Sequence, residues 1–97
     1  MTHSVKILTK RNLWPFVLSV LKSEGKVYAY ELDSIIDRMF GFKPNKIMLY
    51  LVLYSLEDGG LARSKFVERR KYYTITRKGE EELKRFKTLL KVISNQL

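Results

Sequence analysis

Hydrophobic residues recur at helical spacing along the first forty positions of the chain. Residues 13–23 place apolar side chains three and four positions apart, which predicts an amphipathic helix that Asn12 caps and Gly25 ends. The same kind of pattern predicts a second helix over residues 29–40, ended by Gly41. This part of the chain is therefore expected to fold as two helices.

Residues 47–54 are apolar at every position, so their pattern fits a buried strand as well as a helix. The distance from the turn at residues 42–45 to the Gly-Gly pair at 59–60 is too long for a strand. It favours a helix that ends near Glu57, with Asn45 as an alternative N-cap. Because a helix that is apolar on nearly every side tends to be buried, we expect this helix to be buried.

Two short runs rich in branched and aromatic residues follow, at residues 61–67 and 71–76. Polar residues separate the runs, so they are expected to pair as a β-hairpin. Thr76 then caps a last helix over residues 77–95, whose first-turn glutamates complement the helix dipole. A short extended link, which counts as a short strand in the order of elements, is expected at residues 26–28.

The order of these elements predicts the fold class. Two helices joined by a tight turn and followed by a hairpin are typical of a winged helix-turn-helix. We therefore expect an α+β, mostly α fold: a winged helix-turn-helix with a two-stranded β wing and a C-terminal dimerisation helix at 77–97. Residues 1–97 are expected to form a single domain, in which residues 1–11 are an N-terminal arm.

Composition changes this picture mainly through charge. Of the 97 residues, 45% are hydrophobic and 30% charged, and Lys and Arg number 19 against 10 Asp and Glu, for a net charge of +9. Residues 63–97 hold eleven basic and four acidic residues, and residues 63–78 alone carry +6. This density indicates a polyanion partner such as nucleic acid. The alternative is a solvated hairpin edge that basic side chains protect from aggregation.

Several kinds of site are excluded by what the sequence lacks. It contains no cysteine, its one histidine is His3, and it has no glycine-rich phosphate loop, so neither an enzyme, a metal site nor a cofactor is expected. The consecutive glutamates at 80–82 point to different sides of a helix and do not form a metal cluster. The longest apolar run falls short of the roughly 20 residues that span a bilayer, and no signal peptide is evident. We therefore expect a cytoplasmic protein.

Apolar residues on the last helix follow a heptad-like spacing. The members of this seam are Leu83, Phe86, Leu90, Ile93 and Leu97. Their alternating intervals of three and four residues predict a dimer interface. The alternative is that the seam packs on its own domain.

Three blocks of sequence carry a more specific pattern. They are Tyr-Ala-Tyr-Glu-Leu at 28–32, the segment 49–61 that ends in Glu-Asp-Gly-Gly-Leu, and Lys-Tyr-Tyr-Thr-Ile-Thr-Arg-Lys-Gly at 71–79. Together they resemble the PadR-like transcriptional regulators over about residues 16–86, although Ala29 stands where that family usually has glycine. The third block is also similar to MarR-like winged-helix proteins. The resemblance implies a dimeric, sequence-specific DNA-binding repressor or activator without catalytic activity.

The resemblance also implies a small-molecule effector. Related regulators can bind small aromatic molecules between the domain and the dimer helix. Trp14, Phe16 and Phe86 are the residues of this chain that could line such a space. Core packing explains these aromatic residues equally well.

Candidate contacts to double-stranded DNA lie in a turn and in the wing. Because the third helix is apolar, base readout is assigned to the turn before it, whose donors and amide suit guanine and adenine. The candidates in the turn are Lys43, Asn45 and Lys46. The candidates at the tip of the wing, for the minor groove or phosphates, are Arg69, Arg70 and Lys71. Second-rank phosphate contacts are expected from Lys65, Lys6, Lys10 and Arg11.

Three functions remain open from the sequence. The first is a sequence-specific double-stranded DNA-binding transcriptional regulator that acts as a homodimer through the turn and the wing. The second is a winged-helix protein-protein interaction module that docks through the apolar third helix. The third is a nonspecific, chromatin-like DNA binder.

Overall fold

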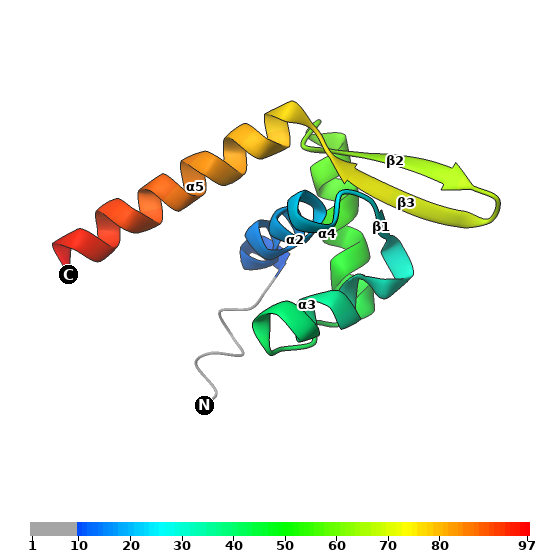
Figure 1. The fold of residues 1–97 in the computed structure, drawn as a ribbon, viewed down its shortest axis with the longest axis horizontal. Helices are drawn as coiled ribbons and strands as arrows, with labels where there is room; N and C mark the ends of the chain where they lie inside the picture. Colours follow the sequence, from blue (N-terminus) through cyan, green and yellow to red (C-terminus); the bar gives the residue numbers. More distant parts are fainter. Residues whose placement is uncertain (1–9) are drawn as a thin grey trace.

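The computed structural model of the chain describes residues 10–97 (Figure 1). The elements in chain order are α2 (Lys10–Glu24), β1 (Val27–Tyr28), the 3-10 turn η1 (Ala29–Glu31), α3 (Leu32–Phe40), α4 (Lys46–Asp58), β2 (Ala62–Val67), β3 (Arg70–Ile75) and α5 (Arg77–Gln96). This mostly helical α+β arrangement confirms the predicted fold class. The predicted N-terminal arm, with Lys6, lies outside the described residues except for residues 10 and 11, which belong to α2.

The first helix begins earlier than the sequence pattern predicts. α2 starts at Lys10, so Asn12 lies inside the helix and the prediction that Asn12 caps it is wrong. Pro15 also lies inside α2, where its missing N–H leaves one carbonyl of the preceding turn without a helical hydrogen bond. The helix ends as expected before Gly25, which adopts a left-handed φ of 84°.

The helix-turn-helix is formed by α3 and α4. The predicted second helix begins with the 3-10 turn η1 and becomes α-helical at Leu32. Gly41, in the left-handed conformation with φ 81°, ends α3, and its amide donates to the carbonyl oxygen of Asp37. Asn45 then caps α4, which confirms a helix rather than a strand over the apolar run.

The sheet contains the short strand and the hairpin that the sequence pattern predicts. Within the described residues its order is β1-β3-β2, and all pairs are antiparallel. β2 and β3 form the predicted hairpin, called the wing below, with Lys65 opposite Tyr72. β1 adds to the free edge of β3, with Val27 opposite Tyr73. The wing extends beyond β1 and ends in a turn at residues 68–69 (Figure 1).

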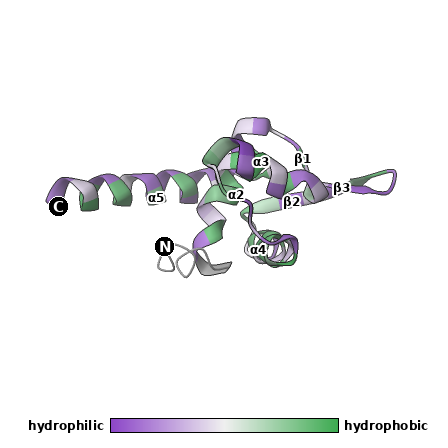
Figure 2. Cartoon of the chain, turned by 90° about the horizontal axis from the view of Figure 1, so that it is seen from below, coloured by the Kyte–Doolittle hydropathy of each residue, from purple (hydrophilic) through white to green (hydrophobic). Residues whose placement is uncertain are grey.

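The core forms where α2 packs against α3, α4, α5 and β3. Its largest fully buried side chains are Leu13, Val17, Leu18, Val20, Leu21, Leu32, Ile36, Leu49, Val52, Leu53 and Leu83. α5 contributes only its first turns to this core, and its remainder projects from the body on the side opposite the wing (Figures 1 and 2). None of the described helices is long and apolar enough to cross a membrane.

Candidate nucleic-acid interface

Lys46, the first residue of α4, is engaged inside the helix-turn-helix. Its Nζ lies 2.9 Å from both carboxylate oxygens of Asp33 on α3 and 2.8 Å from the carbonyl oxygen of Tyr30. The same ammonium lies 4.1 Å from the centre of the Tyr30 ring. Lys46 therefore joins η1, α3 and the start of α4, a structural role that the sequence-based assignment to base contact did not include.

The pair of Asp33 and Lys46 is charged at neutral pH. Asp33 is 4% exposed. Burial by itself raises the pKa of this carboxyl, but hydrogen bonds from Lys46 and the Ser34 amide outweigh it, so the pKa of Asp33 lies below its ordinary value of 3.8. The hydrogen bond to Asp33 raises the pKa of Lys46 above 10.5. A charge-assisted contact thus holds the start of α4 against α3.

The other two candidates in the turn differ in what their side chains do. Oδ1 of Asn45 accepts hydrogen bonds from the amides of Ile47 at 2.8 Å and Met48 at 3.1 Å. Bidentate pairing with adenine needs both the oxygen and the nitrogen of a carboxamide, and the cap already uses the oxygen. Lys43 lies in the turn between α3 and α4, and its side chain is exposed. Of the three candidates, Lys43 is the one whose charge faces solvent.

α4 has one buried side and one exposed side. The buried side consists of Leu49, Val52, Leu53 and Leu56. The exposed side, called the outer face below, consists of Ile47, Tyr50, Leu51 and Tyr54, which are 70%, 40%, 44% and 68% exposed. The expectation that this helix is buried is therefore wrong for half of its surface. In a domain of this size the core covers one side of a peripheral helix, and the apolar outer face is left in water.

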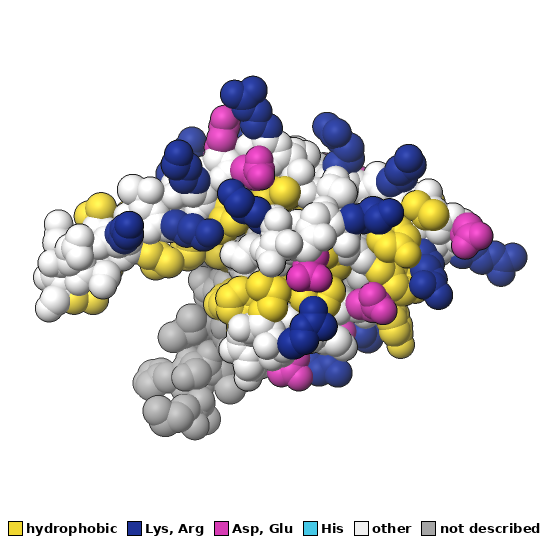
Figure 3. Space-filling view, in the orientation of Figure 1, with side chains coloured by type: hydrophobic (Ala, Val, Ile, Leu, Met, Phe, Trp, Pro, Cys, Tyr) yellow, Lys and Arg dark blue, Asp and Glu magenta, His cyan; other side chains and the backbone are white. Residues whose placement is uncertain are grey.

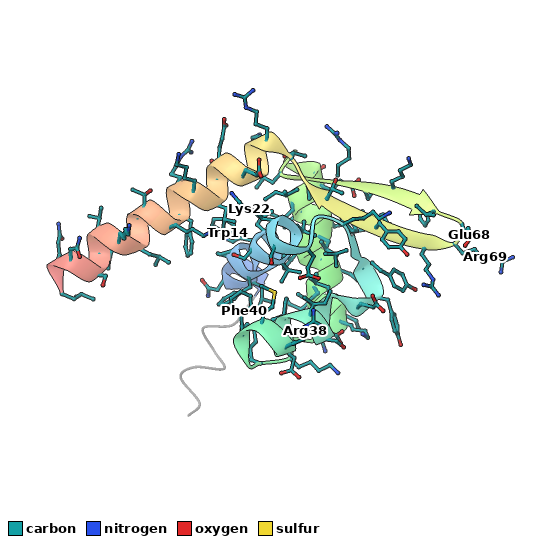
Figure 4. The ribbon with its side chains drawn as sticks, in the orientation of Figure 1. Trp14, Lys22, Arg38, Phe40, Glu68 and Arg69 are labelled. Carbon is teal, nitrogen blue, oxygen red and sulfur yellow. The ribbon has the colours of Figure 1, made fainter. Side chains whose placement is uncertain are left out.

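The wing places neighbouring cations on opposite sides, because side chains alternate along a strand. Lys71 lies on the side that faces α4, with its Nζ 5.5 Å from the centre of the Tyr54 ring. Arg70 lies on the other side, with its guanidinium 5.1 Å from the centre of the Tyr28 ring. Arg69 lies between β2 and β3 at the tip of the wing (Figure 4). The three predicted wing-tip contacts therefore lie in three different places: on the side facing α4, on the opposite side and at the tip.

The side of the sheet turned away from α4 carries two cations, Arg63 and Lys26, that the sequence pattern did not single out as DNA contacts. Arg63 and Lys65 alternate with the α4-facing residues of β2, so they share this side with Arg70, and all three are exposed. Lys26, just before β1, places its Nζ 5.0 Å from the centre of the Tyr72 ring. Lys and Arg side chains surround the wing in the space-filling view (Figure 3). Strand register, which brings these residues together, is the feature that one sequence does not supply.

α4 and the wing border a common hollow of about 420 Å³. It is called the aromatic hollow below, and its lining residues are Tyr28, Ala29, Tyr30, Tyr50, Tyr54, Phe66, Arg69, Lys71 and Tyr73. A hydrogen bond to the Tyr73 hydroxyl raises the pKa of Lys71 above 10.5, and the nearby carboxylate of Glu57 acts in the same direction. The hollow therefore combines aromatic rings with two cationic side chains, a combination that suits a polyanion with apolar or flat groups.

The predicted seam on α5 divides into two parts. Leu83 is 2% exposed and belongs to the core of its own domain. Phe86 packs edge-on against Trp14, with ring centres 5.1 Å apart. Beyond these residues Leu90 and Ile93 are about half exposed, and Leu97 is fully exposed. Leu89 and Val92 widen this exposed stripe. The first part of the seam thus packs on its own domain, which was the alternative interpretation, and the second part is uncovered.

An apolar groove of about 370 Å³ runs between α2 and the start of α5. Phe16, Phe40 and Phe86 line it, whereas Trp14 does not. Phe16 makes edge-to-face contacts with Phe40 and Phe42, each with ring centres 5.0 Å apart. Figure 4 shows Trp14 and Phe40 on this side of the body. Two of the three predicted effector-lining residues therefore meet at one groove.

The helix pair, the wing beside it and the helix that leaves the domain define a winged helix-turn-helix protein. A family model described as the transcriptional regulator PadR-like family matches residues 17–85. The chain therefore belongs to the PadR-like family of transcriptional regulators, which are not enzymes. Among the described residues, no group of three His, Cys, Asp or Glu side chains could hold a metal ion.

Solved structures of similar fold agree with this assignment. F93 from STIV, described as a winged-helix DNA-binding protein, is 26% identical with a TM-score of 0.79, covering 86% of this chain and 91% of that one. A PadR-like regulator from Bacillus cereus is 27% identical with a TM-score of 0.78, covering 94% and 91%. PadR of Bacillus subtilis, solved with operator DNA, is 25% identical with a TM-score of 0.67, covering 78% of this chain and 46% of that one. No curated protein matches this sequence.

Proposed function

We propose that this regulator binds double-stranded DNA in a sequence-specific manner, as a homodimer in the cytoplasm. α4 enters the major groove and the wing lies along the backbone. The observation that carries the proposal is the aromatic hollow, because it brings the outer face of α4 and the cations of the wing to one surface. F93 is named as a DNA-binding protein and PadR of Bacillus subtilis was solved with operator DNA, which supports the same interpretation.

The candidate residues take different parts in this proposal. Lys43 in the turn before α4 and Arg69 at the tip of the wing contact DNA directly, because both are exposed. Lys65 and Arg70 follow the phosphates along the side of the wing, and Lys71 contacts DNA at the aromatic hollow. Asn45 and Lys46 act mainly by fixing the start of α4, through its cap and through Asp33.

We propose that the exposed stripe of α5 forms the dimer contact. Leu90 and Ile93 are about half exposed, Leu97 is fully exposed, and the three follow the spacing of a coiled-coil seam. Phe86, which lines the apolar groove, continues this stripe toward α2. A second copy that packs along α5 therefore also closes the groove, where a small aromatic effector would be held between the domain and the dimer helix.

A protein-protein interaction module is the second candidate function, and the apolar outer face of α4 favours it. The two functions differ in what they require of the wing. A DNA-binding role needs the cations at the hollow, whereas a protein-binding role needs only the apolar face. A nonspecific DNA binder would need the cations but no sequence readout.

Selection from a library of random-sequence duplexes tests the proposal. We expect a recovered site with two related half-sites one helical turn apart, because a symmetric dimer presents two copies of α4. The mass of the free protein in solution is measured alongside and should be that of a dimer. Recovery of no preferred sequence would leave a nonspecific binder, and no binding at low salt would overturn both DNA-binding functions.

A further inference from the structure

The outer face of α4 lacks the side chains that usually read bases. Its residues are two aliphatic and two tyrosine side chains at positions 47, 50, 51 and 54, spaced as one stripe along the helix. The lysine that precedes them, Lys46, has its ammonium bonded to Asp33 and to the Tyr30 carbonyl. After the stripe, the exposed residues are Ser55 and Asp58 near the far end of α4. The stripe therefore offers no amide or guanidinium for two-pronged pairing with adenine or guanine.

The major groove presents one apolar group that such a stripe can recognise, the C5 methyl of thymine. Guanine, adenine and cytosine offer hydrogen-bonding edges there, and an apolar side chain against those edges leaves donors and acceptors without partners. We infer that Ile47, Leu51 and Tyr54 read thymine methyl groups, so that the preferred DNA carries thymines where the stripe meets the groove. This inference rests on the proposed function and names the chemical feature that the DNA site must have.

Charge around the stripe favours DNA over a protein as its occupant. Lys43 is exposed beside the amino end of α4, and Arg69 and Lys71 line the hollow beside Tyr54. Two acidic residues near this surface are paired within the chain: Asp33 with Lys46, and Glu57 with Lys71 and Ser64. Glu68, next to Arg69 at the tip of the wing, is exposed. An apolar strip between cations matches a groove whose floor carries methyl groups and whose edges carry phosphates.

The test compares thymine with uracil, which pairs identically but lacks the C5 methyl. Duplexes recovered by selection are remade with uracil at the thymines inside the site, or at an equal number of thymines in the flanks. We expect the first change to weaken binding by about fourfold for each methyl that the protein buries. The flanking change is the matched control and should leave the affinity unchanged.

A variant protein tests whether the weaker binding of uracil duplexes comes from the lost contact between the protein and the thymine methyl group. In Leu51→Ala, which changes an exposed residue, the uracil penalty should shrink because the contact is already removed from the protein side. Equal binding of thymine and uracil duplexes would overturn the inference and leave the proposed function standing. An undiminished penalty in both Leu51→Ala and Ile47→Ala, two exposed positions of the stripe, would also overturn it, because the penalty would then come from DNA shape. Failure to bind any duplex would overturn the proposed function itself, and the inference with it.

Discussion

At the scale of single residues, Lys46 and Asp33 set the geometry of the helix-turn-helix. The two side chains are thirteen positions apart, and their contact joins α3 to the start of α4. The carbonyl and ring of Tyr30 hold the same ammonium from a third element. An ion pair at the edge of the core therefore holds the start of α4 against α3, while the buried side of α4 packs into the core.

The lowered pKa of Asp33 predicts how stability depends on pH. Because the folded state holds this proton less tightly than the unfolded chain, the ion pair stabilises the fold at pH values above the ordinary pKa of 3.8. That contribution disappears as the pH falls through the lower pKa of the folded state. We expect Asp33→Asn to melt at a lower temperature than the parent at pH 7, with the difference narrowing toward pH 2.

Asp37→Asn is the matched control for this measurement, because Asp37 is an exposed carboxylate on the same helix. Thermal melting of the parent and both variants between pH 7 and pH 2 checks the prediction. A difference in melting temperature between the parent and Asp33→Asn that stays constant with pH would contradict the stabilising role assigned to the ion pair of Asp33 and Lys46.

At Gly79, in the first turn of α5, we expect one added methyl group to lower the stability of the protein strongly. A Cβ there would lie 2.1 Å from the carbonyl oxygen of Leu61 and 2.8 Å from a side-chain carbon of Ile75. We expect Gly79→Ala to destabilise the protein by about 1–3 kcal/mol, despite the better helix propensity of alanine. In the control Gly59→Ala the nearest atom lies at 3.4 Å, so the effect should be small. Urea denaturation of both variants measures the difference, and equal stabilities would contradict the close approach.

Sequence alone could propose Lys46 and Asn45 as site residues but could not assign their roles. Both residue types suit base contacts, and both stand where a recognition helix begins. The rotamer of Asn45 decides whether its side chain caps α4 or contacts a base. Whether the ammonium of Lys46 is free to contact DNA depends on a carboxylate on another helix. Such partners are set by tertiary packing, which a single sequence does not contain.

At the scale of elements, the helices and the hairpin follow from local patterns. Periodic apolar residues and left-handed glycines at 25 and 41 mark the ends of α2 and α3 within a residue or two. β1 could be predicted as a short strand, but its pairing with β3 could not, because a two-residue strand does not specify its partner. The exposure of α4 could not be predicted, since an apolar pattern does not say which side has neighbours.

The contribution of the wing to DNA binding can be separated from the contribution of net charge. We expect Arg69→Ala combined with Arg70→Ala to weaken binding to the selected duplex and to lower the salt slope by about 0.9 log unit for each phosphate that the two arginines no longer neutralise. The matched control is Lys84→Ala with Lys91→Ala, which removes the same charge from exposed positions of α5. Affinities measured across a salt series check the prediction. Equal slopes for the two double variants would show that net charge, and not the wing, drives binding.

At the scale of the whole molecule, the wing and the end of α5 lie at opposite ends of the fold (Figure 1). The wing carries cations, and the end of α5 carries an uncovered apolar stripe. A dimer formed through α5 therefore leaves both wings and both outer faces open. This separation allows dimerisation and DNA binding to be altered independently.

Charged substitutions in the exposed stripe of α5 test the proposed dimer contact. We expect Leu90→Glu with Ile93→Glu to give a monomer that remains folded, because both residues are about half exposed and lie outside the core. The mass in solution and the circular dichroism spectrum check the two halves of this prediction. Lys91→Glu, on the same helix segment, is the control and should stay dimeric. If the double variant remains a folded dimer, the dimer interface lies elsewhere on the molecule.

The most direct test of sequence-specific recognition is the affinity of the intact protein for its selected duplex and for a shuffled duplex of the same composition, measured across a salt series. We predict that the selected duplex binds at least about a thousandfold more tightly, and that both affinities fall as salt rises. Equal affinities for the two duplexes would contradict sequence-specific recognition.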